Sequence, residues 1–368
     1  MPAAGEVRHV GAIELKRGVG MARAQDTRGL GITIMGGDVR TAAAVAGRAE
    51  YRGFESVWTA EFYDRSAAVS LAAMTATTKH ARLGSAIMYA FGRSPVVLTT
   101  EARDLDELSG GRFVLGLGTG TTGQVKDWHG LSAEHLAPRI EELVPLVRQL
   151  WNLDQGPVRH DGSFYHVKIF PATEMTPPLR RELPIYIAAV NKRMVEATGR
   201  VADGLCGHPL YSPEYVDEVV RPALERGSRS AGRSATVPIA GYVLCSVAET
   251  TDRARRAAAA QIAFYTVVKT FEPILALHGF DEEATNIRNA FRGQDMDAAI
   301  DAVSDRMLDT FACYGTAEEA VQRYRSRFAG VYEEPLLFAP SVGHKAGPHR
   351  VMMEAVIDSF TPEAVAVA

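Results

Sequence analysis

The hydrophobic residues of this chain recur in short runs that alternate with longer amphipathic stretches. Eight apolar runs predict buried strands at 30–37, 54–61, 81–90, 112–120, 183–190, 203–207, 236–248 and 334–340. Helical patterns fill the intervals, with start signals such as Asp38 before the first helix and Pro95 in the first turn of the third. Because the strands have no clean polar face, they predict a parallel sheet that is covered on both sides.

The alternation of eight strands with helices predicts the α/β class and a (β/α)8 TIM barrel with insertions. One insertion, 152–182, is rich in glycine, proline and aromatic residues and contains a predicted hairpin. A second, 272–312, is predicted to be helical, and we expect both to build a lid over the pocket and select the substrate. Residues 1–28 are weakly patterned, so we interpret them as an N-terminal extension and 29–368 as a single barrel domain.

Composition narrows the classes of partner. The formal net charge is −4, so no global basic field favours nucleic acid or an anionic membrane. No apolar run approaches the roughly 20 residues that span a bilayer. The three cysteines, Cys206, Cys245 and Cys313, are scattered and provide neither a disulfide framework nor a metal half-site. We therefore predict a cytoplasmic protein that binds no metal, no nucleic acid and no membrane.

The stretch "FVLGLGTGTTG" at 113–123 contains the spacing Gly118-x-Gly120-x-x-Gly123, which is typical of dinucleotide-binding turns. Such a site needs a helix that begins within the motif, whereas the following "QVKDWHGL" is polar and unperiodic and predicts none. Gly116, Gly118 and Gly120 alternate along the strand. They either leave room for a flat ligand or relieve crowding inside a narrow barrel, and the sequence leaves both alternatives open.

Five stretches carry a resemblance to a known family: "GFESVWTAEF" (53–62), "LGSAIMYAFGRSPVVLTTEARDLDELSGGRFVLGLGTG" (83–120), "LPIYIAAVNKRMVEATGRVADGL" (183–205), "AETTDRARRAAAAQIAFY" (248–265) and "YGTAEEAVQRYRSRFAGVYEEPLLFAP" (314–340). They resemble the luciferase-like monooxygenase superfamily, and within it the branch that uses the deazaflavin F420. The resemblance implies a TIM barrel with a flavin or deazaflavin at the carboxyl ends of the strands. In such enzymes the cofactor carries the hydride chemistry, and the protein orients its ring.

The resemblance also implies which residues bind the cofactor. A non-prolyl cis peptide between Ala86 and Ile87 would support the back of the ring. The loop of Thr119, Gly120, Thr121 and Gln124 would meet the ring edge and the ribityl chain. The turn of Ala188, Ala189, Val190 and Asn191 would hold the phosphate at a helix start. Lys192 and Arg193, which follow the turn, would favour an anionic tail such as that of F420.

Glu61 ends the second strand, where the family often has an acidic residue beside the ring. Its carboxylate could bind the ring or substrate, or relay a proton. Alternatively, Glu61 is a structural rim residue that pairs with Arg65 or Arg93. Sugar-phosphate-oxidising relatives have a histidine next to this acid, and Phe62 stands there in this chain. The difference argues against the same alcohol oxidation and leaves the proton donor open.

Two histidines follow predicted strands and are candidates for the barrel mouth. His129 lies beyond the glycine loop, and we name it with Glu61 as a candidate catalytic residue. His208 follows the sixth strand. For each, the alternative is a structural or surface histidine.

Together these observations predict an F420-dependent oxidoreductase that transfers a hydride between the deazaflavin C5 and a small organic substrate, in a homodimer. An alternative with the same fold is a monooxygenase that uses reduced FMN and oxygen. A second alternative is a barrel that only binds a ligand or partner. The glycine spacing lacks the rest of a Rossmann site, and the sequence contains neither a Walker A nor a GxSxG pattern. These motifs therefore favour no other chemistry.

Overall fold

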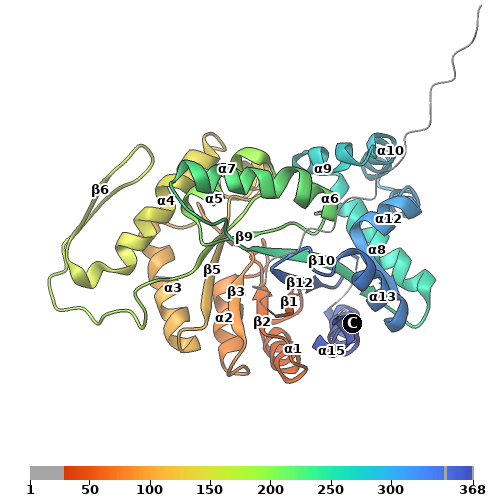
Figure 1. Ribbon diagram of the computed structural model, residues 1–368, viewed down its shortest axis with the longest axis horizontal. Coiled ribbons are helices and arrows are strands. Elements are labelled where there is room, and N and C mark those ends of the chain that lie inside the picture. The colour runs from red at the N-terminus through yellow and green to blue at the C-terminus, as the bar shows by residue number, and fades with distance from the viewer. Residues whose placement is uncertain (1–28, 344–345, 367–368) are drawn as a thin grey trace, which may run out of the picture.

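The computed structural model describes residues 29–343 and 346–366, so the predicted extension at 1–28 lies outside it. Its main sheet closes into a parallel barrel in the order β1, β2, β3, β5, β8, β9, β10 and β12, because β1 pairs with both β2 and β12 (Figure 1). Helices surround this barrel. The structure thus confirms the predicted (β/α)8 architecture.

Each barrel strand falls within one of the eight predicted runs. The strands are β1 (Gly31–Ile34), β2 (Ser56–Thr59), β3 (Arg82–Ser85), β5 (Phe113–Gly118), β8 (Ile185–Ala188), β9 (Gly204–Cys206), β10 (Ile239–Val247) and β12 (Glu334–Phe338). Two short strands join the sheet: β4 (Met88–Tyr89) pairs with β5, and β11 (Ala312–Gly315) pairs with the end of β10. The sequence did not predict β11, which directly follows the last helix of the second insertion.

The helices begin where their capping residues predict. The Asp38 carboxylate accepts hydrogen bonds from the N–H groups of Arg40 and Thr41 at the start of α1, and Gly110 ends α3 with a φ of 67°. The α-helices outside the second insertion are α1 (Val39–Tyr51), α2 (Ala67–Thr75), α3 (Pro95–Ser109), α4 (Leu136–Trp151), α5 (Lys192–Val201), α6 (Pro213–Tyr215), α7 (Arg221–Ser230), α8 (Thr251–Thr266), α13 (Ala317–Arg327), α14 (Ala346–Ser359) and α15 (Pro362–Val365).

The sequence predicted no helix after the glycine loop, and this prediction is wrong. A single π-helical turn, Gln124–Trp128, follows the loop. Two reciprocal bonds start it: Thr121 N donates to Gln124 Oε1 at 2.7 Å, and Gln124 N donates to Thr121 Oγ1 at 3.3 Å. The turn ends before α4 begins at Leu136, so it is not the long helix that a dinucleotide site requires.

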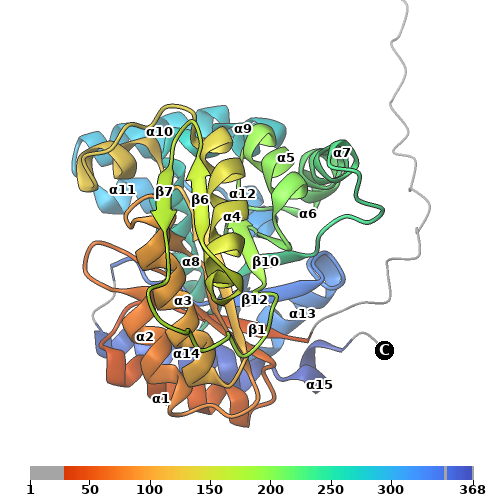
Figure 2. The same cartoon turned by 90° about the vertical axis from the view of Figure 1, so that its left-hand side faces the viewer.

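The first insertion forms the predicted hairpin, from β6 (Val158–Asp161) and β7 (His166–Ile169). Figure 2 shows the hairpin in front of α4. Glu142 of α4 accepts hydrogen bonds from the N–H groups of Phe164 and Tyr165 near the hairpin turn. The hairpin thus packs along the outer side of α4, and its role in a lid stays a prediction.

The second insertion consists of helices, as predicted. It contains α9 (Glu272–Leu277), α10 (Asp281–Arg292), α11 (Met296–Asp301) and α12 (Asp305–Phe311), and α8 and a 3-10 turn (Lys269–Phe271) precede it. Gln261 Oε1 of α8 accepts hydrogen bonds from the N–H groups of Ser341 and Val342, which follow β12. The second half of α8 therefore lies at the carboxyl ends of the barrel strands.

Candidate active site at the barrel mouth

A bulge ends the third barrel strand. Gly84 pairs with Val114 and Met88 with Leu117, so three residues of the β3–β4 segment oppose two residues of β5. The peptide bond between Ala86 and Ile87, inside this bulge, is cis, which confirms the bond that the family resemblance implies. The Ser85 hydroxyl replaces the interrupted strand pairing, since it donates to Gly116 O at 2.8 Å and accepts from Gly116 N at 2.9 Å.

Hydrogen bonds from two directions hold the bulge. The Tyr242 hydroxyl, from β10 on the opposite side of the barrel, donates to Ala86 O at 2.5 Å. Glu61 N donates to Ile87 O at 2.7 Å. Burial raises the pKa of the Tyr242 phenol far above its ordinary value, so it remains a donor. The Ile87 side chain is left half-buried at the mouth. Tyr242 had no signal in the sequence beyond its place in a strand.

The glycines of the fourth barrel strand make room for this bulge. A Cβ on Gly116 would lie 1.7 Å from Ser85 O, and one on Gly118 would lie 2.3 Å from Ile87 Cδ1. Gly120 has a φ of +72°, which favours glycine for conformational reasons. Of the two alternatives left open by the sequence, relief of crowding therefore accounts for Gly116 and Gly118. Gly118 leaves the space that the Ile87 side chain occupies, and a flat ligand beside Ile87 stays a prediction.

Glu61 is held in a buried ion pair. Arg93 Nη2 and Nη1 lie 2.5 Å and 2.7 Å from its two carboxylate oxygens, and Tyr89 N donates to Oε2 at 2.9 Å. Arg65 instead donates to Gly37 O. Desolvation and the Glu61 charge raise the pKa of Tyr89 to about 12. The geometry favours the structural alternative for Glu61, with Arg93 as its partner, and a proton-relay role stays a prediction.

The loop after β5 is braced by its own side chains. Thr119 Oγ1 donates to Gly120 O at 2.9 Å, and Gln124 Oε1 already accepts from Thr121 N. His129 packs edge-on against Tyr89, with ring centroids 4.6 Å apart. Its buried Nε2 has no hydrogen-bond partner among the described residues. An unsatisfied buried nitrogen next to Tyr89 is the kind of polar atom that a bound ligand can satisfy.

The turn after β8 presents a helix start. The carbonyl oxygens of Ala189 and Val190 accept hydrogen bonds from the Tyr211 and Tyr215 hydroxyls at 2.5 Å and 2.9 Å, which fixes the turn. Asn191 precedes α5 without a side-chain capping bond, so its side chain does not occupy the first backbone donors of the helix. Lys192 and Arg193 are exposed there. These features are compatible with an anion at this end of α5.

Aromatic side chains line the rim beside the glycine loop. The rings of Phe62 and Trp128 meet edge to face at 5.1 Å, and Tyr63 joins them with 76% of its surface exposed. On the other side of the mouth, the ring of His208 stacks at 3.9 Å on Phe271, which ends the 3-10 turn after α8. The structure thus brings the aromatic rim, Glu61 and His129 together around Tyr89, and it places His208 on a separate wall.

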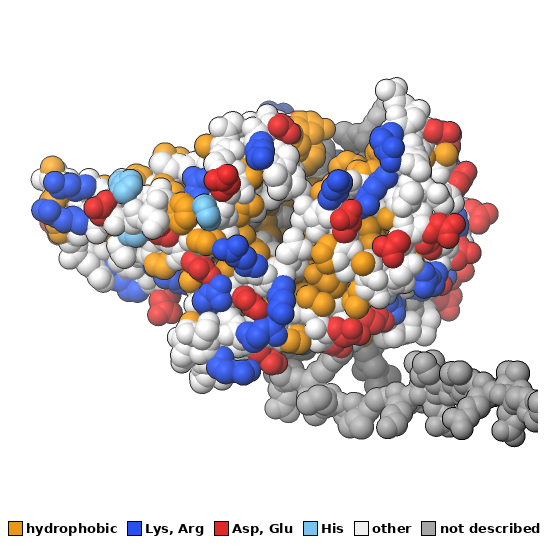
Figure 3. All heavy atoms as spheres, turned by 90° about the horizontal axis from the view of Figure 1, so that it is seen from above, with side chains coloured by type: hydrophobic (Ala, Val, Ile, Leu, Met, Phe, Trp, Pro, Cys, Tyr) orange, Lys and Arg blue, Asp and Glu red, His pale blue; other side chains and the backbone are white. Residues whose placement is uncertain are grey.

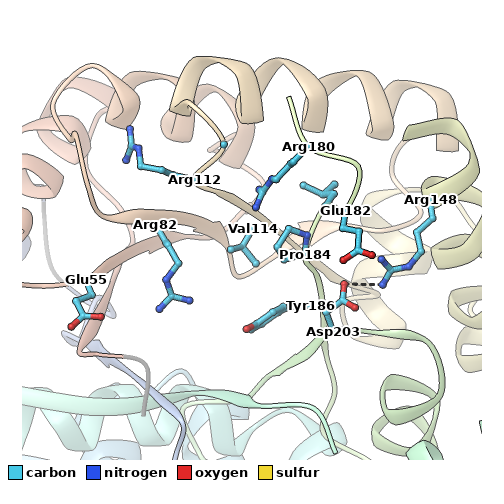
Figure 4. Close-up of a pocket in the computed structure, with 12 residues that line it drawn as sticks. Glu55, Arg82, Arg112, Val114, Arg148, Arg180, Glu182, Pro184, Tyr186 and Asp203 are labelled. Atoms are coloured by element: carbon cyan, nitrogen blue, oxygen red, sulfur yellow. Dashed lines mark hydrogen bonds and ion pairs between the residues drawn. The ribbon is translucent and has the colours of Figure 1, made fainter. Parts of the chain in front are cut away.

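A cavity of about 560 Å³ lies at the other end of the barrel, where the strands begin (Figure 4). Three of the arginines that line it are paired with carboxylates: Arg148 with Asp203, Arg180 with Asp106, and Arg82 with the fully buried Glu334. In TIM barrels, the amino end of the strands serves stability and the carboxyl end serves chemistry. We therefore assign the candidate active site to the mouth.

The surface adds little to this assignment. The face in Figure 3 carries Lys and Arg side chains interspersed with Asp and Glu. Within 29–343 and 346–366, no three His, Cys, Asp or Glu side chains are arranged to hold a metal ion, and no helix is long and apolar enough to cross a membrane. The three cysteines are buried and free.

Comparisons with known proteins agree with this geometry. A profile of the luciferase-like monooxygenase family matches residues 19–333. The chain belongs to this family. Within the luciferase-like monooxygenases, it is 34% identical over 315 residues to an uncharacterized protein of Mycobacterium tuberculosis, an alignment that covers 82% of this chain and 91% of that protein.

The chain is also similar to reductases. The chain is 27% identical over 329 residues to 5,10-methylenetetrahydromethanopterin reductase of Methanopyrus kandleri, which covers 85% of this chain and 92% of the reductase. The solved structure of coenzyme F420-dependent tetrahydromethanopterin reductase from Methanopyrus kandleri matches with a TM-score of 0.78 and 23% identity, over 92% of this chain and 99% of that chain. The latter match supports the fold.

Proposed function

We propose that this protein is an F420-dependent oxidoreductase that transfers a hydride between the deazaflavin C5 and a small organic substrate. The observation that carries the proposal is the bulge at Ala86–Ile87. It presents the half-buried Ile87 side chain at the carboxyl end of the barrel, and the Tyr242 hydroxyl and Glu61 N hold its backbone. The sequence relationship to a reductase supports the same class of reaction.

The residues at the mouth fit a deazaflavin with a long anionic tail. Ile87 supplies an apolar support for a planar ring, and the unsatisfied Nε2 of His129 lies next to Tyr89 beside it. Thr119, Gly120, Thr121 and Gln124 follow β5 with polar groups suited to a polyol. The turn Ala188, Ala189, Val190 and Asn191 would hold the phosphate, and the exposed Lys192 and Arg193 would attract the tail.

In the proposed reaction, the residues of the chain bind the cofactor and orient its ring and the substrate. A bound deazaflavin supplies a ring carbon that gives or takes a hydride. Ile87 would cover one face of the deazaflavin ring, so a substrate could approach only the other face. Holding two reactants in a fixed orientation accounts for a large part of the rate enhancement. The Glu61–Arg93 pair fixes Tyr89 and the segment after the bulge. We assign Glu61 mainly to positioning, and a proton relay through it requires that ion pair to open.

A binding titration tests the cofactor. The fluorescence of each cofactor is expected to be quenched when it binds. We expect the affinity for F420 to be at least about tenfold higher than that for FMN, since about 1.4 kcal/mol of interaction with the tail suffices for this difference. Replacement of Lys192 and Arg193 by glutamate should weaken the binding of F420. It should not weaken the binding of the deazariboflavin part of F420, which lacks the phosphate and the glutamate tail. The matched control is Lys79→Glu, an exposed lysine before β3 at the opposite end of the barrel. Tighter binding of FMN would instead favour the reduced-FMN monooxygenase.

We also propose that the protein is a homodimer and that α2 lies in its interface. The helix "AAVSLAAMT" has no charged residue, yet Val69 on its outer face is 57% exposed. In Figure 1, α2 lies between α1 and α3, and Val97 of α3 is 46% exposed. A helix that is apolar on all sides is normally covered.

The Val69→Asp variant is expected to convert the dimer to a monomer, because each partner would bury an unpaired carboxylate. Light scattering after gel filtration measures the mass. Val351→Asp is the matched control, because Val351 is 65% exposed on α14. A wild-type mass equal to that of one chain, or an unchanged dimer in Val69→Asp, would contradict this assignment.

A further inference from the structure

His208 lies on the inner side of the barrel wall at the end of β9. A Cβ on Gly204 would lie 2.4 Å from Tyr186 Cζ, and the Cys206 sulfur lies 3.5 Å from the Cβ position of Gly116. These two positions of β9 therefore face the barrel interior. Gly207 N still donates to Ala240 O, so the strand geometry continues past Cys206. Because side chains alternate along a strand, His208 continues the inner face one layer above Cys206.

This layer is the barrel mouth, across from the bulge. Strand β9 is three strands away from β3 around the eight-stranded barrel, next to β10, which sends the Tyr242 hydroxyl to Ala86 O. Two aromatic rings from α8 and the 3-10 turn that follows it pack on His208: Phe271 stacks on its ring at 3.9 Å, and Tyr265 meets it edge-on at 4.7 Å. These rings thus cover one side of His208, and the barrel wall holds the other.

The hydrogen bonds of His208 leave one ring nitrogen available. Leu210 N donates to Nδ1 at 3.1 Å, so the ring proton of the neutral imidazole is on Nε2. Within the described part of the chain, Nε2 has no hydrogen-bond partner, and it is not among the nitrogens sealed from solvent. Burial lowers the pKa of His208 to about 3, so the ring is neutral near pH 7. The His208 ring therefore offers a clamped, neutral N–H donor that is not sealed from solvent, at the carboxyl end of β9.

We propose that the Nε2–H group of His208 binds the carbonyl oxygen of the substrate, which is a small ketone, aldehyde or enone. This inference rests on the proposed function, which supplies the reductant. A bound reduced F420 would supply the hydride for the new C–H bond and lose a ring N–H proton to solvent, while the electron pair of the C=O π bond moves to oxygen. Nε2–H stabilises the resulting negative charge, and solvent water protonates the oxygen. A neutral imidazole suits this role because it donates without needing to titrate.

The first test reads the His208 ring rather than turnover. The protein is labelled with ¹⁵N-histidine and loaded with F420, and acetone and cyclohex-2-en-1-one serve as carbonyl probes. We expect both to shift the Nε2 resonance of His208, which is assigned by its loss in His208→Gln. Cyclohexene, which lacks the oxygen, should leave the His208 resonance unchanged. The ring resonances of His166, which is exposed on the hairpin, should not shift with any of the probes. No shift with either ketone, or an equal shift with cyclohexene, overturns the inference.

Two variants then separate donation from structure. His208→Leu removes the donor, and we expect kcat for oxidation of reduced F420 by the ketones to fall about 100-fold. His208→Gln retains an N–H donor and should keep activity within about tenfold of the wild type. The Kd for F420 should be unchanged in both. Equal losses in the two variants, accompanied by weaker F420 binding, would indicate a merely structural role and overturn the proposal.

F420 binding is measured first, so the two failures remain distinct. If F420 does not bind the wild-type protein, the proposed function fails. If F420 binds and neither ketone shifts the His208 resonance, the proposed function stands and only the role of His208 is overturned.

Discussion

The Gly116→Ala variant is expected to lose about 3 kcal/mol of free energy of unfolding, or to fail to accumulate as folded protein. The new methyl group would lie 1.7 Å from Ser85 O and 2.9 Å from Ser85 C. Both contacts are with backbone, which no side-chain rotation can relieve. The displaced backbone belongs to the bulge, and Ser85 Oγ forms two hydrogen bonds with Gly116 there. The substitution therefore strains the strand pair and the ring support together.

Urea denaturation followed by circular dichroism measures this loss, and Gly123→Ala is the matched control. Gly123 has a φ of −64°, and a Cβ there would find its nearest atom at 3.6 Å. Alanine at this position should be neutral or stabilise by up to about 1 kcal/mol. Gly123 completes the dinucleotide-like spacing, so a severe loss in Gly123→Ala together with a tolerated Gly116→Ala would contradict our account of these glycines.

The barrel strands were predictable because each is an apolar run bounded by glycine or polar residues. Outside the barrel, β11 was missed because Ala312–Gly315 follows α12 without a break, so no turn residue marks where it begins, and its pairing with Cys245 and its neighbours is a tertiary contact. The π-helical turn at Gln124–Trp128 has no helical periodicity either. It depends on the Thr121–Gln124 bonds and on Trp128 packing against Phe62.

The site was predictable in position and less so in its contacts. The resemblance led to the cis bond at Ala86–Ile87, because that motif is local in sequence. It left the partner of Glu61 open between Arg65 and Arg93, since both lie on nearby loops and only the folded geometry brings Arg93 to the carboxylate. Tyr242 donates to a residue 156 positions away, and no periodicity signals such a contact.

We expect Glu61→Ala to lose about 3 kcal/mol of stability and to weaken F420 binding. Removal of one member of a buried ion pair leaves the other charge uncompensated. Arg93 is only 16% exposed and would retain Glu101 alone, while the buried Tyr89 N would lose its acceptor. Glu101→Gln is the control, since Glu101 is 32% exposed and its loss should cost less than about 1 kcal/mol.

Glu61→Gln separates positioning from proton relay. The amide oxygen can still accept from Tyr89 N, but the group carries no charge and cannot titrate. If Glu61 positions the bulge, this variant loses stability and F420 affinity, while kcat for ketone reduction at saturating F420 stays within about tenfold, because no acid–base step is lost. If Glu61 relays a proton, kcat falls by about 100-fold or more while the F420 affinity is retained. Because the structure commits both carboxylate oxygens to Arg93, we expect the first result.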